Sequence, residues 1–264
     1  MKIARFRTDE GITFGILDEG EGGAVELVEL VGDPIVSGYD TTGKRFRLDE
    51  VKLLAPVIPR SKVVCVGKNY RDHVEEMKDV TGLGTAEPPA EPLLFLKPNT
   101  SVIGPDDEII SPAISERVEF EGELAIVIGA VAKEVPAERA MEVVYGFTCA
   151  NDVTARDLQI KDGQWSRAKG FDTFWPLGPV IETDLDVSDA EITTRVNGEV
   201  RQHSTTAALI HSLNKIIAHA SEAFTLLPGD VILTGTPAGV GQIVPGDVVE
   251  VEVAGIGVLR NTVR

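Results

Sequence analysis

Three glutamates at alternate positions mark the stretch from residue 118 to residue 129. Glu119, Glu121 and Glu123 precede a β-branched, apolar run that ends at Gly129 and has no helix cap, which predicts a strand entering a core. Because side chains alternate along a strand, the three carboxylates would share one face, with neighbours about 6.6 Å apart. Like charges beside a buried strand are costly unless they protonate, pair with cations or share a metal ion, so a hard divalent cation is the simplest remedy. The alternative is an exposed strand end with a solvated acidic face.

Asp152 follows a second strand-like run, 145–150, at the point where a polar turn begins. Such positions often present functional side chains over a rigid scaffold. With Glu121 and Glu123, Asp152 could complete an all-carboxylate oxygen site. That donor set suits Mg²⁺, Mn²⁺ or Ca²⁺ and disfavours zinc, because no cysteine or paired histidine lies nearby in the sequence. The alternative role for Asp152 is a helix N-cap.

His73 and Glu76 are three residues apart on a short predicted helix, so they are neighbours on one helix face. A carboxylate at this spacing can orient an imidazole and raise its basicity, as a general base requires. The alternative is a satisfied surface or core histidine. The remaining histidines, His203, His211 and His219, lack such a context and are interpreted as structural or solvent-facing. The Gly/Pro-rich stretch 78–91 that follows the pair would be either a lid over a site or a passive connector.

The elements that must position these residues are mostly strands. Residues 2–54 contain short alternating segments separated by polar turns, which predict a small β domain over 1–57, with its boundary near Pro56 and Pro59. The larger part, 58–264, contains a hairpin signal at Asn197-Gly198 and an amphipathic helix predicted over 207–224. The fold class is therefore α+β, predominantly β.

Composition limits the partners of the chain. Its 264 residues carry a formal net charge of −17, which argues against nucleic acid and anionic membrane surfaces because both would repel it. Small metal-bound anions remain possible partners. Cys65 and Cys149 lie in apolar surroundings without a paired motif, which favours buried free thiols in a reducing compartment. The N-terminus lacks the apolar core of a signal peptide and no run reaches a membrane span, so a cytoplasmic location is expected.

Seven short motifs, in order, resemble those of the fumarylacetoacetate hydrolase family, and the resemblance runs from about Ser61 to the C-terminus. The motifs are VGKNYRDH at 66–73, FLKP at 95–98, EGEL at 121–124, NDVTARDLQ at 151–159, KGFDT at 169–173, VNGE at 196–199 and Gly-Thr-Pro at 235–237. The resemblance implies a mixed β-sandwich roll, usually a homodimer. Residues before it look like the small N-terminal β domain of bacterial members rather than the larger domain of the animal fumarylacetoacetases.

The resemblance also implies roles for individual residues. Metal ligation falls to Glu121, Glu123 and Asp152, and the base to the His73 and Glu76 pair. The remaining implied positions contact substrate, with Lys169 also counted among the catalytic residues; they are Lys97, Arg156, Gln159, Lys169 and Thr236. A 2-oxo acid would chelate Mg²⁺ or Mn²⁺ through its carboxylate and keto oxygen, and the ion would stabilise the enolate formed when a C–C bond breaks.

The expected reaction is hydrolysis of an acylpyruvate-type diketo acid to pyruvate and a carboxylic acid. Lys97, Lys169 and Arg156 would supply positive charge, while His73, held by Glu76, would take a proton from the attacking water. The same site chemistry would serve decarboxylation of oxaloacetate or isomerisation of 2-hydroxyhepta-2,4-diene-1,7-dioate in aromatic catabolism. An alternative of another class is a metal-binding scaffold without catalysis.

Overall fold

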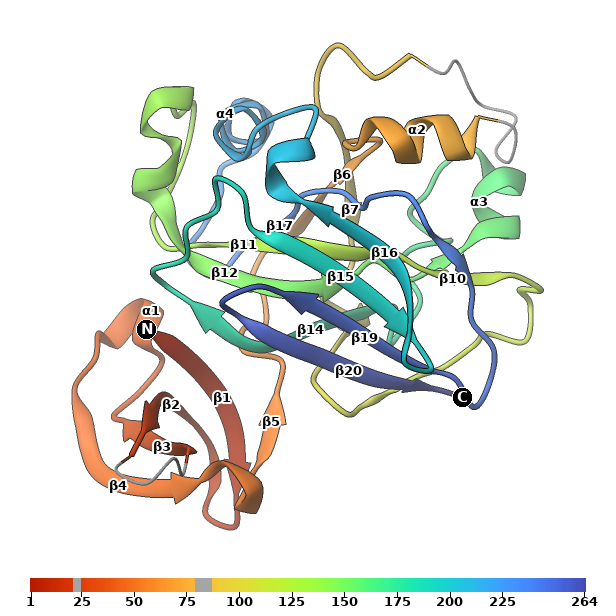
Figure 1. Cartoon of the computed structure of the whole chain (residues 1–264). Coiled ribbons are helices and arrows are strands. Elements are labelled where there is room, and N and C mark those ends of the chain that lie inside the picture. Colours follow the sequence, from red (N-terminus) through yellow and green to blue (C-terminus); the bar gives the residue numbers. More distant parts are fainter. Residues whose placement is uncertain (21–24, 79–86) are drawn as a thin grey trace.

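The computed structural model describes residues 1–20, 25–78 and 87–264, and this part of the chain is mostly β (Figure 1). The predicted predominance of strands is confirmed. Of the predicted lid or connector over 78–91, residues 79–86 lie outside the described residues.

The largest described sheet runs through the whole molecule. Its strand order is β4-β3-β2-β1-β14-β12-β11-β17-β6-β7, with β5 added to β1 and β8 added to β14. The strands are β1 (Lys2–Thr8), β2 (Gly11–Glu19), β3 (Val25–Leu30), β4 (Thr41–Arg47), β5 (Lys52–Leu54), β6 (Val63–Gly67), β7 (Leu93–Lys97), β8 (Val102–Ile103), β11 (Gly122–Ile128), β12 (Val144–Asn151), β14 (Trp175–Glu182) and β17 (Val231–Leu233).

Two smaller sheets complete the β structure of the described residues. The five-stranded sheet has the order β16-β15-β19-β20-β9, and a three-stranded sheet has the order β13-β10-β18. Their strands are β9 (Glu108–Ile109), β10 (Val118–Phe120), β13 (Thr154–Ala155), β15 (Glu191–Val196), β16 (Glu199–Thr205), β18 (Gly241–Gln242), β19 (Val248–Val253) and β20 (Gly257–Val263). The predicted hairpin at Asn197-Gly198 is confirmed: it joins β15 to β16, and both turn residues have positive φ, as a two-residue hairpin requires.

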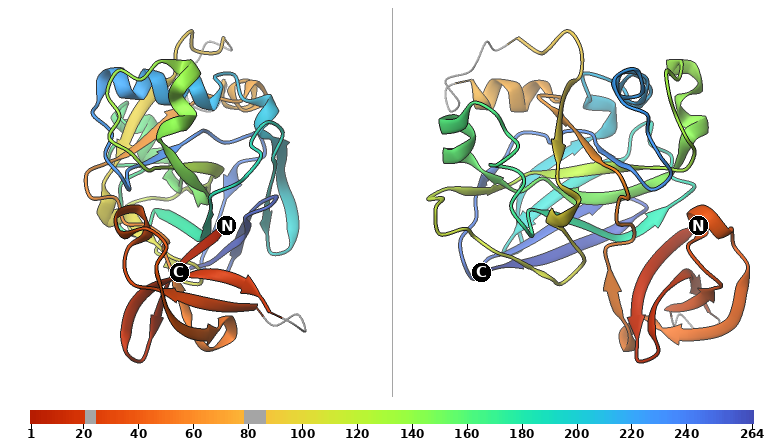
Figure 2. Two further views of the ribbon diagram at one scale, coloured as in Figure 1. Left: turned by 90° about the vertical axis from the view of Figure 1, so that its left-hand side faces the viewer. Right: turned by 180° about the vertical axis from the view of Figure 1, so that it is seen from behind.

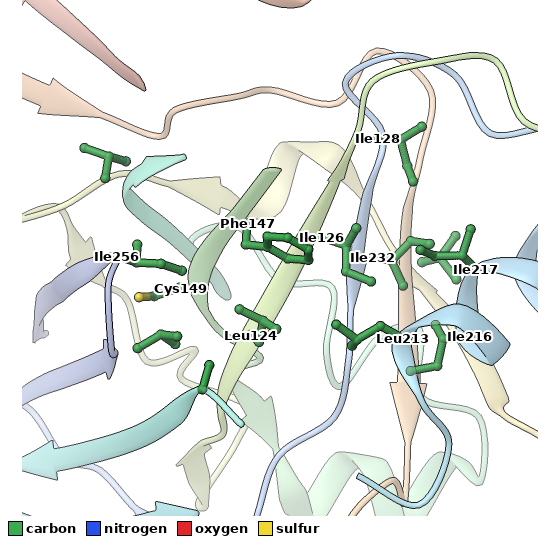
Figure 3. Packing of buried hydrophobic residues seen from close by; sticks show 14 of the residues in the cluster. Leu124, Ile126, Ile128, Phe147, Cys149, Leu213, Ile216, Ile217, Ile232 and Ile256 are labelled. Carbon is green, nitrogen blue, oxygen red and sulfur yellow. The ribbon is translucent and has the colours of Figure 1, made fainter. Parts of the chain in front are cut away.

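The core lies between the five-stranded sheet and the middle of the large sheet. Leu124 and Ile126 of β11 and Phe147 of β12 point into one apolar cluster with residues of β15, β19 and α4 (Figure 3). Ala125 and Val127, on the opposite face of β11, pack into a second cluster with β6 and β17. The strand is therefore buried on both faces, which explains its continuous apolar sequence.

The first five strands, β1 to β5, form a lobe at one end of the molecule, distant from α2 and α3 (Figures 1 and 2). This lobe joins the large sheet through β1, which pairs with β14 at Lys2↔Glu182 and Ile3↔Ile181. Strand β4 was not predicted, because its residues are largely exposed and show no alternation of polar and apolar side chains. The domain boundary near residue 57 stays a prediction.

The α-helices are short. They are α1 (Pro34–Ser37), α2 (Arg71–Met77), α3 (Arg156–Asp162) and α4 (Leu213–Ala223), and the 3₁₀ helices are η1 (Leu48–Glu50), η2 (Asn99–Ser101), η3 (Ala137–Val143) and η4 (Thr206–Ala208). Within the described ranges, no helix has both the length and the apolar character needed to cross a membrane.

The start predicted for the amphipathic helix at residue 207 is wrong, because α4 begins six residues later, at Leu213. Two features stop it from extending further toward the N-terminus. Ser212 caps the helix by accepting a hydrogen bond from the Lys215 amide, and the amides of Ile210 and His211 donate to Asn69 instead of to a preceding turn. A tertiary contact thus overrides the helical periodicity.

Asp230 anchors the parallel pairing of β6 and β17. Its carboxylate is fully buried and accepts hydrogen bonds from Ser61 Oγ at 2.7 Å, the Lys62 amide at 3.0 Å, Lys62 Nζ at 2.8 Å and the Leu227 amide at 2.9 Å. Burial raises the pKa of this carboxyl, but the hydrogen bonds from Lys62, Leu227 and Ser61 outweigh burial and hold the pKa below its usual range.

We expect Asp230→Ala to lower the free energy of unfolding by about 2–4 kcal/mol, because it leaves the amides of Lys62 and Leu227 without an acceptor and removes the ion-pair partner of the half-buried Lys62 ammonium. The matched control is Asp247→Ala in the second Pro-Gly-Asp turn, where the carboxylate is not buried and the loss should stay below about 1 kcal/mol. Denaturant unfolding measures both. Since the folded-state pKa of Asp230 is depressed, its contribution is present above about pH 4 and falls as the pH drops further. Equal losses in the two variants would contradict this role.

Candidate metal and substrate site

Three buried carboxylates meet where β11 begins and β12 ends. One oxygen from each of Glu121, Glu123 and Asp152 lies within 4.8 Å of the others. The strands pair in antiparallel fashion with Gly122 opposite Asn151. Two hydrogen bonds fix the junction, one from the Asp152 amide to the Glu121 carbonyl at 2.8 Å and one from the Glu121 amide to Asn151 Oδ1 at 2.9 Å. The backbone therefore holds all three side chains in one place.

The single strand expected over 118–129 is instead two strands in different sheets. Phe120 ends β10, Gly122 begins β11, and Glu121 lies in the break between them. Gly122 is required here, because a Cβ at this position would lie 2.0 Å from Thr194 Oγ1. The break lets the Glu121 and Glu123 side chains converge with that of Asp152.

Glu119 was expected to share a face with Glu121 and Glu123. This expectation is wrong, because Glu119 is not part of the carboxylate cluster. Its carboxylate is fully buried and is held by the guanidinium groups of Arg156, at 2.6 Å, and Arg117. Arg156 also binds Glu121 and donates to Gln159 Oε1 at 2.6 Å. Glu119 therefore acts as the anchor of Arg156, which in turn reaches the cluster.

Two buried lysines neutralise much of the cluster. Lys169 Nζ contacts Glu121 at 2.7 Å, Asp152 at 2.6 Å and Thr154 Oγ1 at 2.8 Å. Lys97 Nζ contacts the other oxygen of Asp152 at 2.7 Å. Burial raises the pKa of Glu121, but Lys169 and Arg156 outweigh burial and hold the pKa below its usual range. Burial lowers the pKa of Lys169, yet Asp152 and Glu121 raise it overall, so its ammonium stays charged.

Glu123 differs from its neighbours because no cation of the described chain forms an ion pair with it. Its carboxylate accepts a hydrogen bond from the Gly235 amide at 2.6 Å. Burial, and then the charges of Asp152 and Glu121, raise the pKa of Glu123 well above its usual range. A third carboxylate without a cation, placed beside two others, is a donor set that fits a hard divalent ion such as Mg²⁺, Mn²⁺ or Ca²⁺.

His73 and Glu76 lie beside this cluster. His73 Nδ1 is 3.2 Å from Glu76 Oε2, so the predicted proximity of the two side chains is present in the structure. Because a carboxylate only accepts hydrogen bonds, Nδ1 carries the hydrogen and Nε2 is free to take a proton. Glu76 is itself held by the amide of Gly239, at 3.1 Å and 3.2 Å from its two oxygens. This arrangement is suited to a general base.

The loop 235–241 connects the His73 and Glu76 pair to the carboxylate cluster. Its first residue, Gly235, donates to Glu123, and Gly239 donates to Glu76. Thr236 between them donates through Oγ1 to the Gly122 carbonyl at 2.9 Å and accepts from Gln202 Nε2 at 2.7 Å. The loop thus fixes the relative positions of the carboxylates and the His73 and Glu76 pair.

These groups surround one cavity, in which the centres of water-sized molecules can occupy a volume of about 40 Å³. Its lining includes His73 and seven other predicted site residues, which are Glu121, Glu123, Asp152, Arg156, Gln159, Lys169 and Thr236. Lys97 lies behind Asp152 and does not line the cavity, so the structure gives it a contact to a carboxylate rather than to the open space.

Several lining residues were not predicted as site residues. They are Val66, Gly67, Lys68, Met77, Phe95 and Trp165. Gly67 and Lys68 belong to the same motif as His73, and Phe95 to the same motif as Lys97, so their position in the motifs was an available signal. Trp165 had none, because it lies in an irregular segment and reaches Phe95 only through the fold, with ring centroids 5.1 Å apart.

Comparisons with known proteins are consistent with this site. The family model described as "Fumarylacetoacetate (FAA) hydrolase C-terminal" matches residues 62–264, and the model "Rv2993c-like, N-terminal" matches residues 1–56. The crystal structure of 5-carboxymethyl-2-hydroxymuconate delta-isomerase from Mycobacterium smegmatis has a TM-score of 0.90 and 49% sequence identity, and the match covers 100% of this chain and 99% of that one.

Two further relatives bear other names. Human mitochondrial oxaloacetate tautomerase FAHD2A is 44% identical over 81% of this chain and 70% of its own length. The structure of fumarylpyruvate hydrolase from Pseudomonas aeruginosa, in complex with Mn²⁺ and pyruvate, has a TM-score of 0.71 and 33% identity, over 80% of this chain and 91% of that one.

We expect Glu123→Gln to weaken Mn²⁺ and Mg²⁺ binding by more than about 100-fold, since it replaces a ligand with a neutral amide. The same change should leave the metal-free protein at least as stable as wild type, because it removes a buried carboxylate without orphaning a cation. Titration calorimetry measures the affinity and thermal unfolding with and without metal measures the stability. The control is the exposed Glu142→Gln. Undiminished affinity in Glu123→Gln would remove Glu123 from the ligand set.

Proposed function

Because the chain belongs to the fumarylacetoacetate hydrolase family, we propose that it is a divalent-metal-dependent enzyme that hydrolyses a C–C bond in acylpyruvate-type diketo acids. The family includes hydrolases, isomerases and tautomerases of small organic acids. The observation that carries the proposal is that a His/Glu pair and a three-carboxylate cluster line or border one cavity. An ion site and a base in the same space are what a metal-assisted hydrolysis needs.

The proposed ligands are Glu121, Glu123 and Asp152. When bound, Mg²⁺ or Mn²⁺ would supply Lewis acidity to the carboxylate and keto oxygen of a 2-oxo acid. The choice of metal and substrate class is supported by the hydrolase from Pseudomonas aeruginosa, whose structure is a complex with Mn²⁺ and pyruvate. The hardness of an all-oxygen donor set supports it independently.

In the proposed hydrolysis, His73 and Glu76 have separate roles. His73 takes a proton from water, and that water's oxygen attacks the distal carbonyl carbon of the substrate. The bond between this carbon and the methylene beside the keto group breaks, and its electron pair stays with the pyruvate fragment. Glu76 keeps the His73 ring oriented and stabilises its positive charge once it has gained the proton.

The buried cations supply fixed positive charge. Lys169 and Arg156 line the cavity and are each held by two carboxylates, so they need no rearrangement when negative charge develops on the substrate. Since the pKa of Lys169 is raised, it serves as a charged group rather than as a base. Lys97 sits against Asp152 and its proposed role is to hold this ligand. Gln159 and Thr236 would add neutral hydrogen bonds at the cavity wall.

A second candidate is keto–enol isomerisation of a 2-oxo acid, as in a tautomerase. The observation in its favour is that relatives of 44% and 49% identity are named as an oxaloacetate tautomerase and an isomerase. The His73 and Glu76 pair would then move a proton between substrate atoms instead of activating water. Decarboxylation of oxaloacetate is a third use of the same chemistry. The presence of the pair argues against a metal-binding scaffold without catalysis.

Three further proposals concern the whole protein. The division into domains 1–57 and 58–264 is supported by two separate family matches that end at residue 56 and begin at residue 62. A cytoplasmic location is supported by Cys65 and Cys149, both buried free thiols. A homodimer is the assembly implied by the family resemblance.

We expect His73→Ala to lower kcat for acylpyruvate hydrolysis by about 10²–10⁴-fold while Mn²⁺ affinity stays within a few-fold of wild type, because His73 is a base and does not bind the ion. Steady-state kinetics and calorimetric titration of the same preparation provide both numbers. The control is His203→Ala, since His203 is exposed on β16. If metal affinity and rate fall together, His73 is a ligand or a structural residue instead.

The reactions can be ranked on one preparation with a fixed Mn²⁺ concentration. We expect kcat/KM to be higher for hydrolysis of acetylpyruvate or fumarylpyruvate than for decarboxylation of oxaloacetate, since hydrolysis alone uses the activated water. Water labelled with ¹⁸O would mark the released acid only in hydrolysis. Enol–keto conversion of oxaloacetate is followed in parallel by its ultraviolet absorbance. A margin of more than about tenfold in favour of an oxaloacetate reaction, roughly 1.4 kcal/mol of barrier, would make that reaction the better assignment.

A further inference from the structure

Three cations line the cavity, and two of them are already paired. Arg156 binds Glu119 and Glu121, and Lys169 binds Glu121 and Asp152. Lys68 is the third. It is half-buried, and within residues 1–20, 25–78 and 87–264 no carboxylate lies at ion-pair distance from it. The spare positive charge of the cavity is thus at its rim, apart from the carboxylate cluster.

We propose that Lys68 binds the distal carboxylate of a dicarboxylic 2-oxo acid and makes the site select diacids over monoacids of the same length. The inference rests on the proposed function in one respect, which is that the 2-oxo acid end of the ligand occupies the carboxylate cluster. It assigns Lys68 a role in specificity and none in the bond-breaking step.

The backbone of Lys68 has an unusual conformation. Its φ of +58° lies in the left-handed region, which a lysine seldom adopts. The next residue explains why the conformation persists, because the buried Asn69 accepts from the His211 amide at 2.8 Å and donates to the Thr234 carbonyl at 2.8 Å. A strained residue held by its surroundings beside a candidate site points to a functional constraint on that residue.

An aromatic wall runs from the cluster to Gly67, the residue before Lys68. The Lys169 ammonium lies 5.1 Å from the centre of the Phe95 ring, and Phe95 packs edge to face on Trp165 at 5.1 Å. Trp165 in turn covers Gly67, where an added Cβ would lie 2.5 Å from its ring. The wall between Lys169 and Gly67, the residue before Lys68, is therefore aromatic, and Lys68 lines the same cavity.

This pattern matches the chemistry of a 2-oxo diacid. Its two carboxylates lie at opposite ends of a short carbon chain, which is the part that an apolar wall accommodates. The protein's net charge of −17 makes a local cation more important, because the average field around the chain repels dianions. A monoacid of the same length would leave Lys68 with nothing to bind.

The test compares two probes with six carbons each, 2-oxoadipate as the diacid and 2-oxohexanoate as the monoacid. Their dissociation constants are measured by calorimetry with the Mn²⁺-loaded, full-length protein, so the readout is binding and not turnover. We expect wild type to bind the diacid about tenfold more tightly, as for a charge-assisted hydrogen bond at a partly buried site. This preference should shrink at high salt, because the rim is open to solvent.

Two variants separate the effect of the Lys68 charge from that of its left-handed backbone conformation. Lys68→Asn removes the cation but tolerates the left-handed backbone, so folding is preserved and the preference for the diacid should fall to about twofold or less. Lys68→Arg keeps the cation and should keep the preference. Lys161→Met is the control, because Lys161 is an exposed lysine of α3 outside the cavity lining.

The outcomes are distinct for the two proposals. An unchanged preference in Lys68→Asn, or wild-type binding of both acids with equal affinity, overturns the role of Lys68 and leaves the proposed function standing. If wild type binds neither acid in the presence of Mn²⁺, the proposed function fails and the role of Lys68 falls with it. A preference lost in Lys68→Asn, kept in Lys68→Arg and kept in Lys161→Met supports the inference.

Discussion

The charge balance among buried carboxylates is the constraint on which the rest of the structure depends. Glu119, Glu121, Glu123 and Asp152 are each at most 4% exposed. Each buried charge costs several kcal/mol unless a partner compensates it, so their presence requires matching cations at the same depth. Lys97, Arg156 and Lys169 supply that compensation and leave Glu123 as the carboxylate without an ion pair in the described chain. Glu123 therefore lacks a cationic partner among the described residues, and a divalent ion would supply one.

The fold meets this constraint by bringing distant segments to the start of β11. Its apolar half is buried between two clusters and fixes the strand rigidly, while the break at Glu121 turns the chain out of one sheet into another. β12 delivers Asp152 through regular antiparallel pairing, and the loop 235–241 ties the cluster to Glu76 by backbone amides. Side chains held by core strands and by amides lose little freedom on binding a ligand, which favours both metal affinity and catalysis.

Local sequence patterns predicted much of the candidate site. The apolar run after Glu123, the strand end before Asp152 and the three-residue spacing of His73 and Glu76 were enough to place those side chains on elements that the structure contains. What the sequence could not supply came from tertiary contacts. The helical periodicity predicted a start at residue 207, but the amides of Ile210 and His211 donate hydrogen bonds to Asn69, so the helix begins only at Leu213. Regular alternation put Glu119 with the cluster, but the chain breaks at Glu121 and Arg156 draws Glu119 aside. The cavity role of Trp165 depends on a ring contact that no spacing encodes.

The division between a fixed interior and an adaptable rim explains how one architecture can support several reactions. Stabilising negative charge on a 2-oxo acid is common to hydrolysis, isomerisation and decarboxylation, and the groups that would do so are buried and mutually paired. In the proposed function, the next step depends on whether a water or a substrate carbon faces the buried His73, and the half-buried Lys68 and Trp165 line the same cavity. Relatives named as hydrolase, isomerase and tautomerase share this family. We therefore place the choice of substrate and reaction in the rim residues, where substitutions change recognition without disturbing the buried charge balance.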